Sequence, residues 1–468
     1  MASNKPSTEL NTEIFREYDI RGVYQKDFDE SFAFNLGRAL VTYILSNTTS
    51  NTAEAKNPVV TLGHDARLSS PSLSKAMAEG LQSAGAKVIF LGLVTTPISY
   101  FSMFTLDNPA GGVMITGSHN PPEYNGFKIS VGKTTIFGEE IQKLCHIMKS
   151  AQYASGQGAY TTFNIFEDYV ARYKQEFKDM PPVKVVLDCG NGAAGCIARR
   201  LFEAVGLKPV ILFEEPDGRF PNHHPDPTVE KNLVDLKKAV LEHGAQIGIG
   251  FDGDADRIGV VDEKGRYIQG DELMVVISRS ILKERPGSKI IGDVKCSDRM
   301  YDDVKKHGGQ PIMWKTGHSL IKTKIKEEKA PFGGELSGHV FFADRNYGYD
   351  DALYAGLRMV EAVAKSGQPL SHLLEGFPPA FNTPEIRIDT TEDKKRSIVE
   401  KLRSIYKSDT ADYKVNLIDG IRISYKDGWA LARASNTQPV LVLRFESTTQ
   451  AGLDRIQGEI EKIVNPLL

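Results

Sequence analysis

Residues 116–128, with the sequence TGSHNPPEYNGFK, place a serine hydroxyl among groups that suit a phosphate. His119 and Lys128 supply the proton-carrying or cationic groups that a weak hydroxyl nucleophile or a charged phosphoryl group requires. The prolines after Asn120 oppose a helix and hold the turn rigid. A surface turn is the alternative, since Ser, Asn and Pro also favour turns for local reasons. We predict that Ser118 is a nucleophile on a rigid loop.

A second polar loop, residues 252–257 (DGDADR), directly follows the apolar run 245–251. It carries three aspartates at alternate positions: Asp252, Asp254 and Asp256. Such carboxylates can converge on one side of a tight loop as ligands for Mg²⁺ or Ca²⁺. An EF-hand would also place Glu263 suitably, but Arg257 stands where that loop needs glycine, and the flanks predict strands instead of helices. The sequence therefore predicts a site for Mg²⁺ or Ca²⁺ that is not an EF-hand.

Three further polar segments permit weaker interpretations. Residues 433–439 (RASNTQP) lie between predicted strands at 429–431 and 440–445, and their guanidinium, hydroxyl and amide groups suit a phosphate, although a hairpin turn explains them too. The glycines of residues 190–195 are interpreted as aids to close packing in preference to a phosphate cradle. The adjacent His223 and His224 have no third ligand at useful spacing, so we interpret them as loop structure.

These motifs together resemble those of the α-D-phosphohexomutases, in particular the bacterial phosphomannomutase/phosphoglucomutases. The resemblance covers nearly the whole chain, and the motifs stand in the family's order. It implies that Ser118 is phosphorylated in the resting enzyme. It also implies that Mg²⁺ is held by Ser118, through a phosphate oxygen, and by Asp252, Asp254 and Asp256.

The resemblance implies further site residues. The catalytic group would comprise Ser118, Lys128, Arg21, His119 and His318. The substrate-binding group would comprise Tyr18, Arg257, Lys295, Glu335, Ser337, His339, Arg433, Ser435, Asn436 and Thr437. Glu335 and Ser337 would read sugar hydroxyls, and the segment 433–437 would bind phosphate. Which group moves the hydroxyl proton stays open among Lys128, His119, Arg21 and His318.

Alternating apolar strands and amphipathic helices predict an α/β fold. Together with the resemblance, they predict three related α/β domains with mixed sheets and a smaller C-terminal α+β domain around a central cleft. The predicted boundaries are 1–163 for the phosphoserine loop, 164–266 for the metal loop, 267–378 for the sugar loop and 379–468 for the phosphate-binding domain. Residues 139–175 are predicted to be helical with a polar break at 155–158. A helix is predicted from Pro71, capped by Ser70.

Composition limits the possible partners. The 468 residues include 57 basic and 60 acidic side chains, a formal charge of −3, which does not indicate a nucleic-acid partner. The polar N-terminal stretch and the lack of a long apolar run indicate no membrane segment. Four cysteines without a CxxC pair fit a reducing compartment. We therefore expect a cytoplasmic protein, and we expect it to be a monomer.

The expected activity is interconversion of the 1-phosphates and 6-phosphates of mannose and glucose, with hexose 1,6-bisphosphate as intermediate and activator. The nearest alternative is phosphoglucosamine mutase, whose sugar loop is similar, although the apolar Leu336 favours the mannose and glucose subgroup. A non-catalytic phosphosugar-binding protein is an alternative from another class, but it would not need Ser118, Lys128 and three aspartates together. A phosphatase is a third, because an exposed phosphoserine would be hydrolysed.

Overall fold

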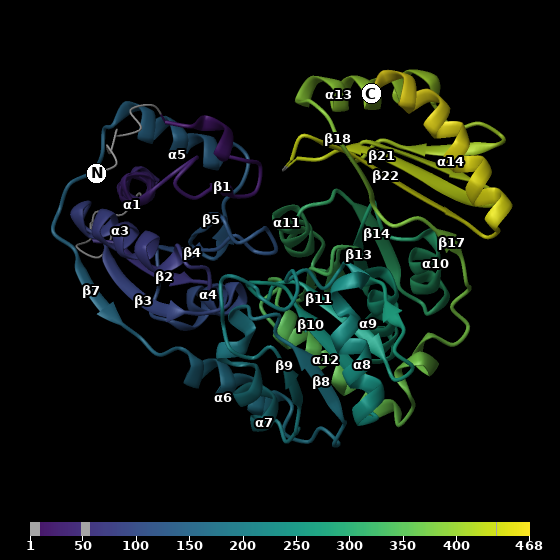
Figure 1. The fold of residues 1–468 in the computed structure, drawn as a ribbon, viewed down its shortest axis with the longest axis horizontal. Helices are drawn as coiled ribbons and strands as arrows, with labels where there is room; N and C mark the ends of the chain where they lie inside the picture. Colours follow the sequence, from purple (N-terminus) through teal and green to yellow (C-terminus); the bar gives the residue numbers. More distant parts are fainter. Residues whose placement is uncertain (1–9, 48–56, 437) are drawn as a thin grey trace. The chain divides into compact units, whose positions relative to one another are not determined.

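The computed structural model describes residues 10–47, 57–436 and 438–468 (Figure 1). The chain divides into two compact units. The first comprises the described residues up to Gln269 together with Ser337–Phe341 and Tyr349–Leu373. The second comprises Gly270–Leu336, Phe342–Gly348 and Leu374–Leu468. Within the described part of the chain, no helix has both the length and the apolar character needed to cross a membrane.

The first sheet of the first unit has the order β1-β5-β4-β2-β3-β7, with β6 paired to β5. Its strands are β1 (Ile20–Val23), β2 (Val59–His64), β3 (Lys87–Leu93), β4 (Gly111–Ile115), β5 (Tyr124–Val131), β6 (Thr134–Thr135) and β7 (Ala159–Thr162). Its helices are α1 (Glu30–Ser46), α3 (Ser70–Ser83), α4 (Thr96–Thr105) and α5 (Glu139–Ser150), preceded by a 3₁₀ turn, Thr12–Ile14. One apolar core joins α1, α3 and α5 to strands β1 to β5.

The second sheet, also in the first unit, has the order β12-β11-β10-β8-β9. Its strands are β8 (Val185–Asp188), β9 (Val210–Leu212), β10 (Ile247–Phe251), β11 (Ile258–Asp262) and β12 (Tyr267–Ile268). The accompanying helices are α6 (Phe166–Glu176), α7 (Ala198–Ala204), α8 (Val234–His243) and α12 (Ala352–Ser366), with 3₁₀ turns Ala193–Cys196, Glu230–Leu233 and Leu370–Leu374. Every residue of β10 is buried, which explains its continuous apolar run.

The second unit contains the fourth sheet and most of the third, whose strand β16 begins in the first unit. The third has the order β14-β13-β15-β16, formed by β13 (Lys289–Asp293), β14 (Gln310–Trp314), β15 (Phe332–Gly334) and β16 (Val340–Phe342). Its helices are α9 (Gly270–Glu284), α10 (Asp298–Lys306) and α11 (His318–Glu328). The fourth sheet comprises β17 (Phe381–Asn382), β18 (Ile386–Asp389), β19 (Tyr413–Asn416), β20 (Ile421–Tyr425), β21 (Gly428–Ala434) and β22 (Val440–Ser447). Helices α13 (Glu392–Ile405) and α14 (Gln450–Val464) cover one face of it (Figure 1), and a 3₁₀ turn, Asn465–Leu467, ends the chain.

The first three sheets repeat one arrangement. In the first, β2 is parallel to both β3 and β4. In the second, β8 is parallel to both β9 and β10. In the third, β13 is parallel to both β14 and β15. The prediction of three related α/β domains and a smaller α+β domain is therefore confirmed, while the exact domain boundaries stay a prediction.

The repeat places the candidate loops at equivalent points. Strand β4 ends just before the Ser118 loop, which we define as residues 116–123. Strand β10 ends just before Asp252, and β15 ends just before Glu335. The carboxyl ends of strands in α/β sheets are the usual places for ligand-binding residues, because the chain there leaves the sheet as an exposed loop.

Three local predictions were wrong. Within 139–175, Ala159–Thr162 forms strand β7, because this polar segment pairs in parallel with β3. The N-cap of α3 is Ser69 instead of Ser70, and its side chain makes no capping hydrogen bond. Arg433 lies in β21, which continues past Leu431 because its backbone stays paired with β22 as far as Ala434.

Candidate active site

The Ser118 hydroxyl lies against the acidic loop. Its Oγ donates to Asp252 Oδ2 at 2.9 Å and lies 3.1 Å from His119 Nδ1. Ser118 itself is buried and adopts a left-handed backbone conformation with φ of 49°. The acidic loop comes close because Gly253 has no side chain: a Cβ there would lie 2.4 Å from the Ser118 carbonyl oxygen. The two loops, 134 residues apart in the chain, therefore meet backbone against backbone.

Lys128 joins the same cluster from strand β5. Its Nζ donates to Asp254 Oδ2 at 2.7 Å and to Asp256 Oδ2. Although burial disfavours the ammonium form, these two carboxylates raise the pKa of Lys128 well above its usual value. Burial likewise opposes ionisation of Asp254, but Lys128 holds the pKa of that carboxyl below its usual range. Lys128 is therefore a fixed cation beside the candidate nucleophile.

The three aspartates have the chemistry of a metal site. Their side chains are completely buried, and one oxygen from each lies within 4.8 Å of the others. Asp254 Oδ1 and Asp256 Oδ1 accept no hydrogen bond from the described residues. Burial and the neighbouring carboxylates raise the pKa of Asp252 well above its usual value. A divalent cation would relieve this repulsion, because one ammonium group balances only part of three buried carboxylates.

Positive groups surround His119 on the same unit. Burial and the charges of Arg257 and Arg21 lower the pKa of His119 well below its usual value. Arg21 lies on β1 and pairs with Asp19, and the preceding Tyr18 is buried. Arg21 reaches this part of the site because β1 pairs with β5, the strand that carries Lys128. In that pairing Arg21 lies opposite Gly126.

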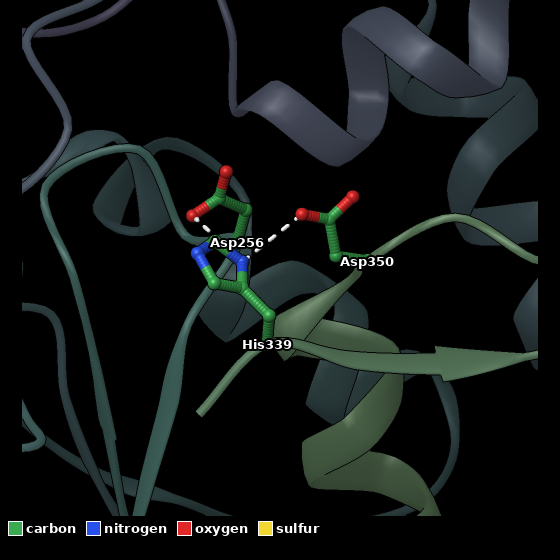
Figure 2. A group of neighbouring side chains, drawn as sticks. All are labelled: Asp256, His339 and Asp350. Carbon is green, nitrogen blue, oxygen red and sulfur yellow. Dashed lines mark ion pairs between the residues drawn. The ribbon is translucent and has the colours of Figure 1, made fainter. Parts of the chain in front are cut away.

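Asp350 is a site residue that the sequence interpretation missed. Figure 2 shows its carboxylate and that of Asp256 turned toward His339; Nδ1 lies 3.0 Å from Asp350 Oδ2 and 3.6 Å from Asp256 Oδ1. Arg257 Nε donates to His339 Nε2 at 3.0 Å. An arginine nitrogen can only donate, so Nε2 is the acceptor and Nδ1 carries the proton. His339 therefore orients Arg257. A lone aspartate before a predicted helix gave no signal of this role.

The second unit gathers a separate set of predicted residues. Glu335 is buried and accepts from Gly317 N at 2.5 Å, next to His318 at the start of α11. Thr316 N donates to Asp419 Oδ2 at 3.0 Å, and Arg433 Nε pairs with the same oxygen at 3.1 Å. Asp419 therefore links the strand that carries Arg433 to the loop just before His318.

Lys295 is buried in the same unit and lies 3.3 Å from Glu385 and 3.7 Å from Asp293. Burial would lower its pKa, but Glu385 and Asp293 raise it. Burial opposes ionisation of Glu385, yet Lys295 and Arg387 lower the pKa of this carboxyl to about 2. The sequence interpretation missed Glu385 and Asp419, because single carboxylates in loops carry no recognisable motif.

The remaining predicted positions are less closely held. Ser337 is partly exposed and belongs to the first unit, so the predicted sugar loop 332–339 passes from one unit to the other. Ser435 is buried and Asn436 is exposed in the turn after β21. Thr437 lies outside the described residues. His223 bonds to Asp188 at 3.0 Å, in agreement with its interpretation as loop structure.

Comparison with known proteins identifies all four predicted domains. Models of phosphoglucomutase/phosphomannomutase match residues 12–155 (alpha/beta/alpha domain I), 166–265 (domain II), 269–381 (domain III) and 385–463 (C-terminal domain). A phosphomannomutase/phosphoglucomutase of Pseudomonas syringae pv. tomato is 44% identical over 97% of this chain and 96% of its own. A phosphoglucomutase of Neisseria gonorrhoeae is 41% identical over 98% of each chain.

A solved structure gives the same result. The phosphoglucomutase/phosphomannomutase family protein of Burkholderia thailandensis superposes with a TM-score of 0.89 at 40% identity, over 98% of each chain. Matching models over all four domains, and relatives above 40% identity along nearly the full length, leave one conclusion. The chain belongs to the phosphoglucomutase/phosphomannomutase family of phosphohexomutases.

Proposed function

We propose that this enzyme interconverts the 1-phosphates and 6-phosphates of glucose and mannose through a phosphorylated Ser118. The contact between Ser118 Oγ and Asp252, within a buried cluster of three aspartates and Lys128, carries the proposal. A protein that only binds phosphosugars would not need a hydroxyl beside a cluster of carboxylates suited to a metal ion. Burying these charges costs desolvation free energy, which catalysis would justify and binding alone would not.

In the proposed reaction, a sugar hydroxyl attacks the phosphorus of phospho-Ser118. A bond from phosphorus to the sugar oxygen forms, the bond to Ser118 Oγ breaks, the hydroxyl proton passes to a base of the site, and Oγ takes up a proton. The 1,6-bisphosphate then turns round, and its other phosphate returns to Ser118 by the reverse step. Lys128, Arg257 and Arg21 stabilise the charge of the transferring group. The bisphosphate is the intermediate of this reaction. It is also an activator, because it can transfer a phosphate to an unphosphorylated Ser118.

We propose Mg²⁺ as the metal, bound by Asp252, Asp254, Asp256 and a phosphate oxygen on Ser118. Mg²⁺ prefers oxygen ligands and a few carboxylates combined with a substrate phosphate. When bound, it would polarise the phosphoryl group. Buried oxygens of Asp254 and Asp256 without a hydrogen bond from the described residues support this assignment. The monomeric state and the cytoplasmic location stay predictions from the sequence.

A coupled assay comparing mannose 1-phosphate, glucose 1-phosphate and glucosamine 1-phosphate tests the substrate class. We expect turnover of the first two and little of the third. Preference for glucosamine 1-phosphate would establish phosphoglucosamine mutase instead, and net release of inorganic phosphate would establish a phosphatase. Binding of all three without turnover would leave the non-catalytic alternative.

We propose that Glu335 binds hydroxyls shared by both sugars. Glu335→Gln should lower kcat/KM for glucose and mannose phosphates by a similar factor of roughly 10 to 150, since a charged hydrogen bond contributes about 1.5 to 3 kcal/mol. The glutamine carbonyl can still accept from Gly317 N, so the fold should persist. Glu328→Gln, which removes a surface charge paired with Lys289, is the control. Loss of one substrate alone would contradict this role.

We propose that Arg433 binds the phosphate that is not being transferred, whichever end of the sugar carries it. Arg433→Ala should lower kcat/KM by roughly 10- to 150-fold for every substrate alike, because one charged hydrogen bond is lost in each case. Asp419 holds the guanidinium in place in the resting protein. Arg455→Ala on α14, paired with Asp427, serves as control. An effect restricted to one sugar would show that Arg433 is not a shared phosphate receptor.

A further inference from the structure

Arg67 has an unusual environment for an arginine. Its side chain is completely buried, and it lies just after β2, where the chain leaves the first sheet. Within the described residues, Asp65 is the one carboxylate that forms an ion pair with it, and Nε lies 3.2 Å from Oδ2. On one side the guanidinium carbon lies 5.3 Å from the ring centre of Phe220. A buried charge of this kind needs further polar partners to offset the loss of water.

Those partners are main-chain oxygens around the candidate nucleophile. Arg67 Nη2 donates to the carbonyls of Ser118 at 2.7 Å and Asn120 at 2.5 Å. Nη1 donates to the carbonyls of Pro121 at 2.5 Å and Tyr124 at 2.9 Å. One guanidinium group therefore gathers four carbonyls from the Ser118 loop and the first residue of β5. A lysine could not do so, because its compact ammonium lacks the planar fork of five donors.

Asp65 holds the other side of the loop. Its Oδ2 accepts from Gly117 N at 3.2 Å, and its Oδ1 accepts from Arg67 N at 3.0 Å and from Ser70 Oγ at 2.6 Å. Gly117 passes so close to the guanidinium that a Cβ there would lie 2.5 Å from Arg67 Cζ. The Ser118 loop is thus attached to the end of β2 on both sides of the serine.

This attachment matters for phosphoryl transfer. Ser118 has a φ of 49°, a conformation that non-glycine residues adopt only when the surroundings impose it. In the proposed reaction, Oγ must hold one position while its phosphoryl group leaves and a second one arrives. A displacement of about 1 Å in such a reaction can cost on the order of 100-fold in rate. Four carbonyl contacts to one rigid group supply this constraint without touching the reacting atoms.

We propose that Arg67 is a positioning residue for phosphoryl transfer, which fixes the main chain of the Ser118 loop so that Oγ returns to the same place in each half of the cycle. The inference rests on the proposed function of Ser118. Arg67 acts through the backbone, so its loss should slow the transfer step while the binding of hexose phosphate by the other site residues is retained.

The test compares Arg67→Lys with Arg358→Lys, which places a lysine at another buried arginine of the same unit, where Nη1 donates to Tyr354 Oη. We expect Arg67→Lys to lower kcat by about 100-fold, with KM changed less than about 3-fold. Phosphorylation of Ser118 by glucose 1,6-bisphosphate can be monitored in a single turnover by intact-mass analysis. Its rate should fall by the same factor as kcat. Hydrogen exchange should increase in residues 116–124 and not elsewhere. Arg358→Lys should keep the wild-type kcat.

A folded Arg67→Lys protein with wild-type kcat would overturn the inference, as would a loss of kcat no larger than that of Arg358→Lys. If Arg67→Lys does not fold, Gly117→Ala is the second variant. It keeps the arginine, but its Cβ pushes the Ser118 loop away from the guanidinium. A wild-type kcat for Gly117→Ala would also overturn the inference. An inactive wild-type protein in the same assay would contradict the proposed function instead, so the two failures are distinguishable.

Discussion

Ser118→Ala is expected to lower kcat by on the order of 10⁴- to 10⁶-fold, the range found when a catalytic nucleophile or its activating partner is removed. The alanine lacks the oxygen that would carry the phosphoryl group, so the covalent step at this position is lost. Intact-mass analysis should show one phosphate on the wild-type protein and none on the variant. The coupled assay with glucose 1-phosphate measures the loss of turnover.

Ser130→Ala provides the control, because Ser130 is a buried serine on the same strand, β5, as Lys128. The Ser130→Ala protein should keep the phosphate on Ser118 and the turnover of the wild type. Both variants should keep a similar Tm, since Ser118→Ala removes only the Oγ atom, with its hydrogen bond to Asp252 and its contact with His119. Near-wild-type turnover by Ser118→Ala would remove the phosphoserine mechanism altogether.

Removal of the metal should have the second large effect. Excess chelator is expected to abolish turnover, and Mg²⁺ should restore it, because the charge of the transferring phosphoryl group would otherwise be stabilised by the cationic side chains alone. Asp254→Asn should weaken Mg²⁺ binding by at least about 10- to 100-fold. Removal of a residue that only hydrogen-bonds to a metal ligand already costs this much, and Asp254 would be a ligand itself. Titration calorimetry with Mg²⁺ measures this independently of activity.

Asp262→Asn is the matched control. Asp262 is a buried aspartate at the far end of β11, where its Oδ1 accepts from the main chain of Lys264 and Arg266 in the hairpin. Its replacement should lower stability modestly and leave Mg²⁺ affinity unchanged. Full activity of the wild-type protein in excess chelator, or equal Mg²⁺ affinity in Asp254→Asn and wild type, would remove the metal from this site.

Local chemistry explains why much of the fold could be predicted from the sequence. The apolar run 245–251 predicts a buried strand, and the structure has β10 at Ile247–Phe251. The predicted strand at 440–445 is likewise present, as part of β22 (Val440–Ser447). Strand β7 was missed because its four residues are all exposed and lack apolar alternation. Its pairing with β3 is a tertiary contact, which a periodicity argument cannot detect.

The amino-acid sequence by itself determined which groups the candidate site contains and which loops carry them, because each motif is contiguous and each follows a strand whose apolar pattern is local. Only the tertiary structure decided which groups meet. The pairing of β4 with β5 and the approach of Gly253 to the Ser118 loop bring Ser118, Asp252 and Lys128 together across the first two sheets. Asp419 contacts Thr316 across 103 positions, and the Arg67 guanidinium contacts Ser118 across 51, so the preference of buried charges for polar partners, and not any local spacing, selects these contacts.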